Sequence, residues 1–344
     1  MLAAFLIIGS GILTFLGVEV FRRWSLKREL LDIPNERSSH ARPTPRGGGL
    51  AIVVVVLAAY VVVAWFLQGE FSWGFFLGAA FVALISWLDD LYSITFVWRF
   101  LVHCLAAALV IANLGYFNEI TLLTSSGTLT FGLFGILLTG LWIVWVINAY
   151  NFMDGIDGIA GLQAVVAFTG WAAAAWLMGA EAIALFAGVG TAASAGFLIH
   201  NWEPAKIFMG DVGSAFLGFT LAVLPLMVAS AVPISAPDMP ILATAFIWPF
   251  VFDTVITFFR RLFRGERVWT AHRTHLYQRM IINGRSHKNV SKIYGGLSSI
   301  IIVAALAAFF TELPWKYAVY TAMAVTLAIP LFLANKNVDP SHQK

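Results

Sequence analysis

Long apolar runs follow one another along almost the whole sequence, and they limit the folds that this chain can adopt. A membrane-spanning helix needs about 20 predominantly apolar residues. The runs "GLFGILLTGLWIVWVI" and "LQAVVAFTGWAAAAWLM" are two examples. Only 11% of the residues are charged, against about 25% in soluble domains. We therefore predict an all-α, polytopic integral membrane protein.

The apolar runs predict 10 or 11 transmembrane helices. The expected spans are residues 1–20, 48–67, 72–88, 97–115, 131–149, 159–177, 183–200, 213–232, 240–259, 290–311 and 316–334. The first run lacks a basic start and its positive charges follow it, so we interpret it as a retained helix rather than a signal peptide. The single cysteine, Cys104, lies in an apolar run and is expected to be a small buried hydrophobe.

The basic residues predict the orientation of these helices. With the spans above, all of the 21 Lys and Arg residues except Lys316 fall on one face of the membrane. Positive charges collect on the cytoplasmic side. We therefore expect the N-terminus outside, the C-terminus in the cytoplasm and the polar segments on the cytoplasmic face.

No soluble domain is expected, and residues 1–344 are interpreted as one integral membrane domain. The candidate catalytic loops are about 21–47, 88–96, 148–158, 201–213 and 260–289. No convincing internal repeat is visible, which weakens the alternative of a cation-coupled transporter built from inverted halves.

The segment "NAYNFMDGIDGIAG" places polar side chains at the end of a predicted span. Asn148, Asn151, Asp154 and Asp157 recur every three residues, so neighbouring members share a helix face. Ionisable groups at membrane depth are costly and functional by default. A polar, capped helix end is the alternative interpretation, but four groups at a regular step exceed what capping requires.

Three further acids lie on the same predicted face. Asp89 and Asp90 end a span and diverge by about 100° on a helix, so we expect one to face the site and the other to brace it. Asp211, in "FMGDVGS", precedes a helix whose free N–H groups bind anions, although it could simply be an N-cap. Asp253 lies within a span, where it could be a structural acid paired with an arginine.

Clustered carboxylates repel one another unless a cation joins them. Carboxylate and amide oxygens, without cysteines or clustered histidines, suit a hard ion such as Mg²⁺. Mg²⁺ is usually held by one or two carboxylates together with substrate phosphates. The acids therefore imply a phosphorylated substrate.

Two basic loops fit a phosphorylated substrate. The first carries the candidate substrate-binding residues Arg37, His40 and Arg46, and the second carries His272, Arg273 and His275. Arginine is a planar donor that matches phosphate oxygens. A plain positive-inside anchor is the alternative for the second loop. A zinc site at the two histidines would need further ligands, which are not apparent nearby.

The motifs "DDLYS", "NAYNFMDGIDGIAG", "FMGDVGS" and "HRTHLYQR", after "PNERSSHARPTPRGGG", resemble the polyprenyl-phosphate N-acetylhexosamine-1-phosphate transferases, which are glycosyltransferase family 4 of the MraY/WecA superfamily. The resemblance covers about residues 20–290. It implies transfer of a sugar-1-phosphate from a UDP-N-acetylamino-sugar to undecaprenyl phosphate, with release of UMP. It also implies Mg²⁺ dependence with Mn²⁺ as a substitute, a bacterial inner membrane location, a homodimer and no nucleic-acid partner.

The same resemblance implies roles for individual residues. Metal binding falls to Asn151 and Asp211, and catalytic or supporting roles fall to Asp89, Asp90, Asp154 and Asp157. Substrate binding falls to Asn148, Arg37, His40, Arg46, His272, Arg273 and His275. A direct displacement and a path through a covalent aspartyl-phosphate both remain open at this stage.

One departure from the family pattern bears on the substrate. The peptidoglycan branch carries consecutive histidines in the last cytoplasmic loop, whereas this chain has "HRTHLYQR". The resemblance therefore points to the branch that initiates O-antigen, lipopolysaccharide or other envelope polysaccharides. N-acetylglucosamine and 6-deoxy amino sugars such as FucNAc or QuiNAc are the candidate sugars. A phospho-N-acetylmuramoyl-pentapeptide transferase is the alternative within the family.

Overall fold

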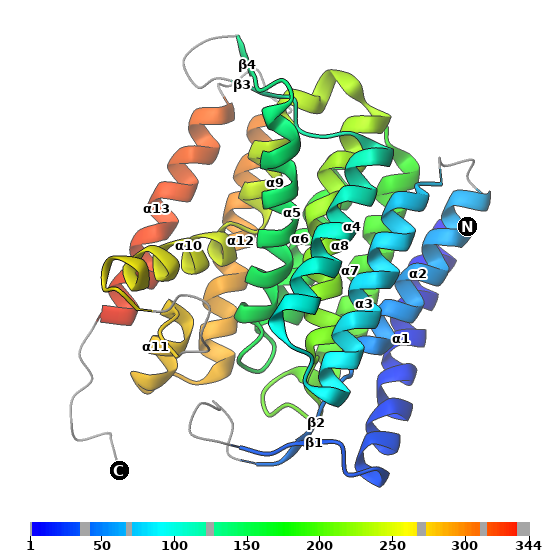
Figure 1. Ribbon diagram of the computed structural model, residues 1–344, viewed down its shortest axis with the longest axis vertical. Helices are drawn as coiled ribbons and strands as arrows, with labels where there is room; N and C mark the ends of the chain where they lie inside the picture. Colours follow the sequence, from blue (N-terminus) through cyan, green and yellow to red (C-terminus); the bar gives the residue numbers. More distant parts are fainter. Residues whose placement is uncertain are drawn as a thin grey trace.

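The structure is a computed structural model that describes residues 2–34, 42–66, 71–121, 127–266, 273–309 and 315–335. It is a bundle of helices (Figure 1). The long helices are α1 (Leu2–Lys27), α2 (Gly49–Phe66), α3 (Trp73–Tyr92), α4 (Phe96–Leu114), α5 (Phe134–Met153), α6 (Ile159–Leu177), α7 (Glu181–Asn201), α8 (Asp211–Ala231), α12 (His287–Phe309) and α13 (Trp315–Asn335). Within the described ranges, nine helices are long and apolar enough to cross a membrane, and α2 is a shorter apolar helix. The prediction of an all-α, multi-pass membrane protein is confirmed.

The span predicted at residues 240–259 is not a straight helix. A 3₁₀ helix, η1 (Pro233–Asp238), leads into α9 (Met239–Phe246), and α10 (Trp248–Phe263) then turns away by 76°. Pro249 lies in the first turn of α10, where its missing N–H and its ring prevent α9 from continuing through it. The chain bends at Ile247 for this reason, and α10 crosses the direction of the other helices (Figure 1).

Two short antiparallel ribbons complete the fold. One joins β1 (Leu31–Asp32) to β2 (Thr44–Pro45), and the other joins β3 (Glu119–Thr121) to β4 (Thr128–Thr130). They lie at opposite ends of the bundle (Figure 1). Both belong to connections between helices, so they leave the helical class of the fold unchanged.

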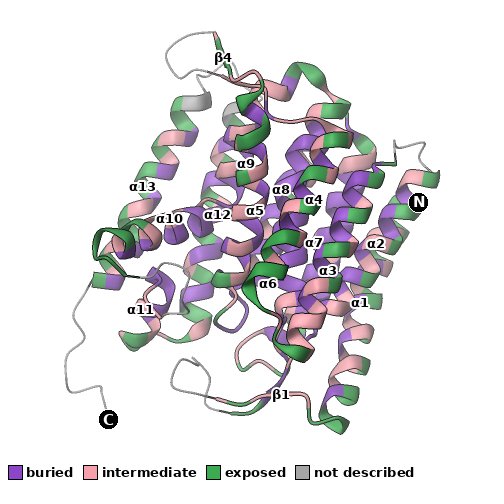
Figure 2. Cartoon of the chain, in the orientation of Figure 1, coloured by how far each residue is buried: buried purple, intermediate pink, exposed green. Residues whose placement is uncertain are grey.

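Helix α8 forms the centre of the bundle, and it is buried along nearly its whole length (Figure 2). Small residues allow this close packing. At Gly218, an added Cβ would lie 2.8 Å from the Tyr150 side chain and 2.9 Å from the Val146 carbonyl oxygen of α5. The outer helices instead expose large apolar side chains such as Phe5, Trp98 and Leu133, as expected for surfaces that face lipid.

The polar motifs gather at one end of the bundle. The turns after α3, α5 and α7 lie at the same end as the β1–β2 ribbon and the short helix α11 (Leu276–Ile282) (Figure 1). The motifs "DDLYS", "NFMDGIDG" and "FMGDVGS" lie in these turns and in the helix ends that border them. The fold therefore brings together motifs that are far apart in the sequence.

Candidate active site

The first half of the site forms where the chain enters α2 and α8. Backbone N–H groups of Gly48 and Gly49 donate to the carbonyl oxygens of Phe208 and Met209, both at 2.9 Å. Close packing follows, since a Cβ added at Gly213 would lie 2.7 Å from the Cα of Gly49. Side chains that precede these two helices are therefore held against each other.

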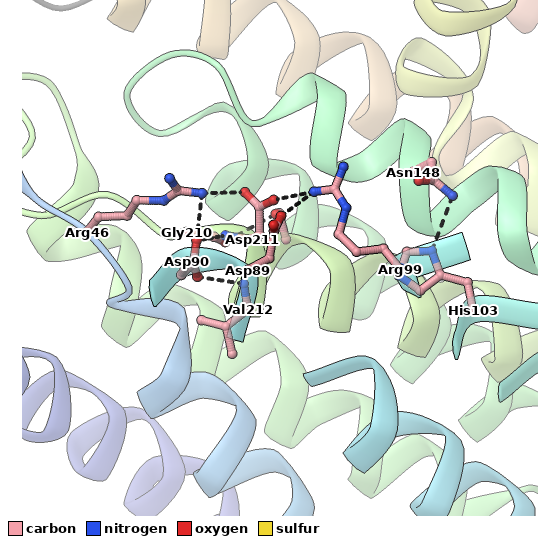
Figure 3. A network of polar contacts seen from close by, with 10 residues as sticks. Arg46, Asp89, Asp90, Arg99, His103, Asn148, Gly210, Asp211 and Val212 are labelled. Atoms are coloured by element: carbon pink, nitrogen blue, oxygen red, sulfur yellow. Dashed lines mark hydrogen bonds and ion pairs between the residues drawn. The ribbon is translucent and has the colours of Figure 1, made fainter. Parts of the chain in front are cut away.

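The backbone pairing of Gly48 and Gly49 with Phe208 and Met209 places the Arg46 side chain in the site. Its Nη2 lies 2.7 Å from Oδ1 of Asp211 and 2.6 Å from Oδ1 of Asp90 (Figure 3). Burial opposes the charge of the guanidinium, but the Asp211 and Asp90 carboxylates raise the pKa of Arg46 above its usual value. The side chain keeps 37% of its surface exposed, so the cation can be reached from outside the protein.

Asp90 braces the start of α8. Its two carboxylate oxygens accept the backbone N–H groups of Asp211 and Val212, each at 3.0 Å. The side chain is only 4% exposed. Gly210 has a φ of 78°, and a Cβ there would lie 2.7 Å from Asp90 Oδ2, so glycine permits this approach. The anion at this helix N-terminus is thus the protein's own carboxylate, in agreement with the expectation that one acid of the pair is a brace.

Asp89 faces the other way and forms the second half of the site with Arg99. The Arg99 guanidinium pairs with the Asp89 carboxylate, and the same Nη1 lies 3.1 Å from Oδ2 of Asp211 (Figure 3). Arg99 is in the first turn of α4, ten residues after Asp89. Asp211 therefore lies between two arginines, with Arg46 on one oxygen and Arg99 on the other.

The two asparagines of α5 lie beside this group at different depths. Asn151 is adjacent to the Asp211 carboxylate. One helical turn earlier, Asn148 donates from Nδ2 to the Val144 carbonyl oxygen at 2.7 Å and lies 3.4 Å from Nδ1 of His103 (Figure 3). His103 is buried, and its Nε2 has no hydrogen-bond partner among the described residues.

Asp154 and Asp157 follow α5, and the structure gives them different surroundings. Burial raises the pKa of Asp154 well above its usual range, and the nearby Asp211 charge adds to this effect. Asp157 is held by its neighbours instead. Its Oδ2 accepts the Ala205 N–H at 3.0 Å, and its Oδ1 lies 3.3 Å from Nδ1 of His287. Asp154 therefore borders the cluster, whereas Asp157 ties the α5–α6 turn to other segments.

The last basic loop is anchored by Asp253, which is completely buried. The predicted arginine partner is replaced by other donors, which are Nδ1 of His275, the hydroxyls of Thr257 and Tyr294, and the backbone N–H groups of Leu276 and Tyr277. His275 is itself buried and begins α11 as part of a capping box with Gln278. The structure therefore places His275 at this anchor, apart from the Asp89–Asp211 pair.

The remaining predicted substrate-binding residues are only partly covered by the structure. Arg37, His40 and His272 lie outside the described residues. Arg273 is described, is half-buried and lies in the turn just before α11. Their proposed contacts with a substrate stay predictions.

The oxygen donors at Asp211 fit a hard divalent cation. Asp89 and Asn151 both lie beside Asp211, so two carboxylates and one carboxamide meet at one place. Adjacent carboxylates need a cation between them, and here arginine supplies it. Among the described residues, no three His, Cys, Asp or Glu side chains form a metal-binding group. This incomplete set suits Mg²⁺, which usually completes its coordination with water and substrate phosphates.

Arg99 is the component of the site that sequence reasoning missed. It was counted only as a positive charge that fixes the orientation of the helices. A signal was nevertheless present, because a lone cation follows "DDLYS" within a short turn and is flanked by apolar residues. Charges at such positions pair with neighbouring acids. This arrangement can bind an anion at Arg46 or Arg99 and a cation at the Asp89–Asp211 pair.

Comparison with known proteins places this site within a described family. A sequence model of glycosyl transferase family 4 matches residues 72–229. A probable undecaprenyl-phosphate N-acetylglucosaminyl 1-phosphate transferase from Bacillus subtilis is 31% identical over 273 residues, which cover 78% of this chain and 74% of the relative. A decaprenyl-phosphate N-acetylglucosaminephosphotransferase from Mycolicibacterium smegmatis is 30% identical over 369 residues, covering 94% of this chain and 87% of the relative.

Relatives named as phospho-N-acetylmuramoyl-pentapeptide-transferases match over a shorter length. A phospho-N-acetylmuramoyl-pentapeptide-transferase from Halalkalibacterium halodurans is 27% identical over 198 residues. These residues cover 54% of this chain and 61% of the relative.

Proposed function

The chain belongs to glycosyl transferase family 4, and from this premise we propose that it transfers an N-acetylamino-sugar-1-phosphate from a UDP-sugar to undecaprenyl phosphate, releasing UMP. The relatives from Bacillus and Mycolicibacterium carry names for this kind of reaction with polyprenyl phosphates. The observation that carries the proposal is Asp211, whose carboxylate lies between Arg46 and Arg99 and beside Asp89. Both signs of charge needed by a phosphate-transfer reaction meet there.

The reaction joins two anions, so the site must first reduce their repulsion. In our proposal, an oxygen of the lipid phosphate attacks the phosphorus next to the sugar, and the bond from that phosphorus to the bridging oxygen breaks. UMP leaves with the bridging oxygen and its negative charge. Phosphoryl transfer depends mainly on positioning and charge neutralisation. Arg46 and Arg99 supply donors for phosphate oxygens, and both remain partly exposed.

The attacking group does not need a strong base. The second pKa of a phosphate monoester is about 6, so the lipid phosphate is largely ionised at neutral pH. Asp89 is half-buried and already paired with Arg99, which suits a group that orients the cation and the incoming phosphate. We therefore propose direct displacement, with Asp89 as a positioning group, over a covalent aspartyl-phosphate path.

Magnesium is the cofactor that we propose for the Asp211 group. Asp211 and Asn151 would hold it, with Asp89 nearby, and Mn²⁺ would be a substitute. When bound, the ion supplies Lewis-acid stabilisation of the charge on the diphosphate. Asp154 and Asp90 would support this arrangement, Asp154 from the rim and Asp90 by holding the start of α8.

We propose GlcNAc as the first sugar to test, since the names of both long matches contain N-acetylglucosamine. A 6-deoxy amino sugar such as FucNAc or QuiNAc is the second choice. The shorter match to the muramoyl-pentapeptide transferase, together with "HRTHLYQR" in place of consecutive histidines, supports an initiating step of O-antigen or another envelope polysaccharide.

The location follows from the lipid acceptor. We propose a bacterial plasma membrane protein with its site on the cytoplasmic face, because all but one of the Lys and Arg residues lie on that predicted side. The isoprenoid chain would stay in the bilayer while its phosphate reaches the cluster. A homodimer remains part of the proposal.

The decisive experiment uses purified protein in lipid nanodiscs. UMP release is measured with undecaprenyl phosphate and a panel of UDP-amino-sugars, with Mg²⁺, with Mn²⁺ and with EDTA. We expect release with one sugar, complete loss in EDTA and partial recovery in Mn²⁺. If no UDP-sugar yields UMP while proteoliposomes show cation flux, the transporter alternative replaces this proposal.

A further inference from the structure

Tyr277 connects the anchored basic loop to the segment that carries Asn151 and Asp154. Its backbone N–H donates to Asp253 Oδ2 at 3.0 Å, so its main chain is fixed by a completely buried carboxylate. Its hydroxyl donates to the Phe152 carbonyl oxygen at 3.0 Å. The Tyr277 side chain is itself buried without exposed surface.

The carbonyl group of Phe152 lies at a helix end, where no backbone N–H group of the same helix is available to it. Phe152 is the penultimate residue of α5, and the last four carbonyl groups of a helix lack partners within it. Tyr277 therefore satisfies the end of α5 between Asn151 and Asp154. A hydrogen bond there fixes where the helix stops and how the following residues leave it.

Gly155 shows how closely the turn approaches the phenol. A Cβ added at Gly155 would overlap the Tyr277 hydroxyl oxygen, and the next nearest atoms would be the ring carbons Cζ at 3.1 Å and Cε2 at 3.3 Å. The glycine after Asp154 is thus required by one oxygen atom of Tyr277. Without that oxygen, the ring would need to move by only a few tenths of an ångström to make room for a Cβ at Gly155.

From these contacts we propose that Tyr277 is a positioning residue, which holds the Asn151–Asp154 segment in the arrangement that the transfer reaction uses. This inference rests on the proposed function. Tyr277 touches the main chain of the segment rather than a substrate. Because small misplacements of reacting groups lower rates by about 10²-fold, removal of the hydroxyl should lower kcat and leave substrate affinity nearly unchanged.

The first experiment compares Tyr277→Phe with Tyr60→Phe. Tyr60 is a matched control, since its buried hydroxyl also contacts a main chain, at Ser72. Ser72 caps the start of α3, whereas Asp89 and Asp90 lie at the other end of that helix. For Tyr277→Phe we expect kcat to fall at least about 10-fold, with KM for both substrates within about twofold. Tyr60→Phe should keep the kcat of the unsubstituted protein at a similar melting temperature. An unchanged kcat in Tyr277→Phe, or an equal fall in both variants, would overturn the inference.

The second experiment tests the geometry by rescue. Gly155→Ala alone should lower kcat about 10²-fold, because the new methyl group displaces either the segment or the phenol. In the Tyr277→Phe background the same substitution should cost less than about threefold, since the overlapping oxygen is gone. If Gly155→Ala lowers kcat by the same factor in both backgrounds, the hydroxyl does not set the position of this segment.

A third measurement is independent of turnover. Hydrogen–deuterium exchange of residues 148–158 should rise in Tyr277→Phe and stay unchanged in Tyr60→Phe. If the unsubstituted protein releases no UMP from any UDP-sugar, the proposed function fails, but faster exchange would still support the structural link. If exchange is unchanged in Tyr277→Phe, the link itself is absent and the inference fails while the proposed function stands.

Discussion

The charge of the buried Asp253 and the charges of the Asp89–Asp211 pair are neutralised in different ways. Asp253 accepts hydrogen bonds from a histidine, two hydroxyls and two backbone N–H groups, and it has no exposed surface. Asp89 and Asp211 are instead neutralised by the arginines Arg46 and Arg99, whose guanidinium groups remain partly exposed. The donors around Asp253 are buried and have no access to a substrate, whereas the partly exposed guanidinium groups could also donate to an incoming phosphate.

From this difference we infer a structural role for Asp253, whereas Asp89 and Asp211 are the acids that we propose to act in the chemistry. Both groups lie in a helical bundle, and both carry charges that are costly to bury. The acids that retain exchangeable partners are the ones that a charged substrate can reach. We therefore expect substitutions of Asp253 to affect mainly stability, and substitutions of Asp211 and Arg99 to affect mainly activity.

The largest effect is expected for Asp211→Asn. The substitution keeps the shape of the side chain but removes the charge that faces Arg46, Arg99 and the proposed metal. We expect kcat/KM for UMP release to fall by about 10³-fold or more. The melting temperature in detergent should change little, because the arginines are partly exposed. Asn151→Ala should also lower kcat/KM for UMP release. Full activity in both variants would show that Asp211 and Asn151 do not hold the metal.

Asp253→Asn should reverse this pattern. Loss of the buried charge leaves its fixed donors poorly matched, and breaking such a group costs about 3 kcal/mol of unfolding free energy. We expect a lower melting temperature and a smaller folded fraction. The fall in kcat per folded molecule should be much smaller than for Asp211→Asn, since Asp253 acts on the Asn151–Asp154 segment only through Tyr277. A variant that keeps its stability but loses turnover would show that Asp253 acts in the chemistry and would break the comparison.

Arg99 provides a sharper test within the open group. Arg99→Gln leaves the Asp89 and Asp211 carboxylates without one of their cations, and we expect kcat/KM to fall by about 10²-fold. Arg99→Lys should recover part of the loss, because it restores the charge but not the planar donors. Equal activity of the two variants would indicate that the charge of Arg99 has no role.

The smallest effect is expected at Asn148. Its amide already donates to Val144 within α5, and it lies one turn deeper than Asn151. We expect Asn148→Ala to lower kcat/KM by about 10-fold through a higher KM, measured by UMP release over a range of lipid phosphate concentrations. A loss as large as that of Asp211→Asn would place Asn148 among the metal or catalytic groups.

Much of this fold could be predicted from the sequence, because apolar runs of sufficient length have few alternatives in a membrane. The bend between α9 and α10 was missed because residues 240–259 are mostly apolar and long enough for one span, and within this run Pro249 marks the break. The amphipathic character of α10, with Arg260 and Arg261 at its end, becomes meaningful only once that break is known.

The sequence could predict most residues of the site, but not which of them contact one another. Regular spacing identified the asparagines near the end of α5 and the acids that follow it, and the adjacency of Asp89 and Asp90 predicted that their roles differ. Spacing carries no information about contacts between distant segments, such as the 165 residues that separate Arg46 from Asp211. For the same reason, spacing could not show that His275, Tyr294 and two backbone N–H groups donate to Asp253.

The pairing of Asp89 with Arg99 has a consequence for biosynthesis. These two residues belong to neighbouring helices, so they can meet as soon as the α3–α4 hairpin has left the ribosome, long before Asp211 is translated. In the nascent hairpin, Arg99 would then compensate the charge of Asp89 before α8 is made, while Asp90 would pair with Arg46, which is translated earlier. Under the proposed function, Asp211 would join this pair only when α8 packs into the bundle, so reactivity would depend on that later step of assembly.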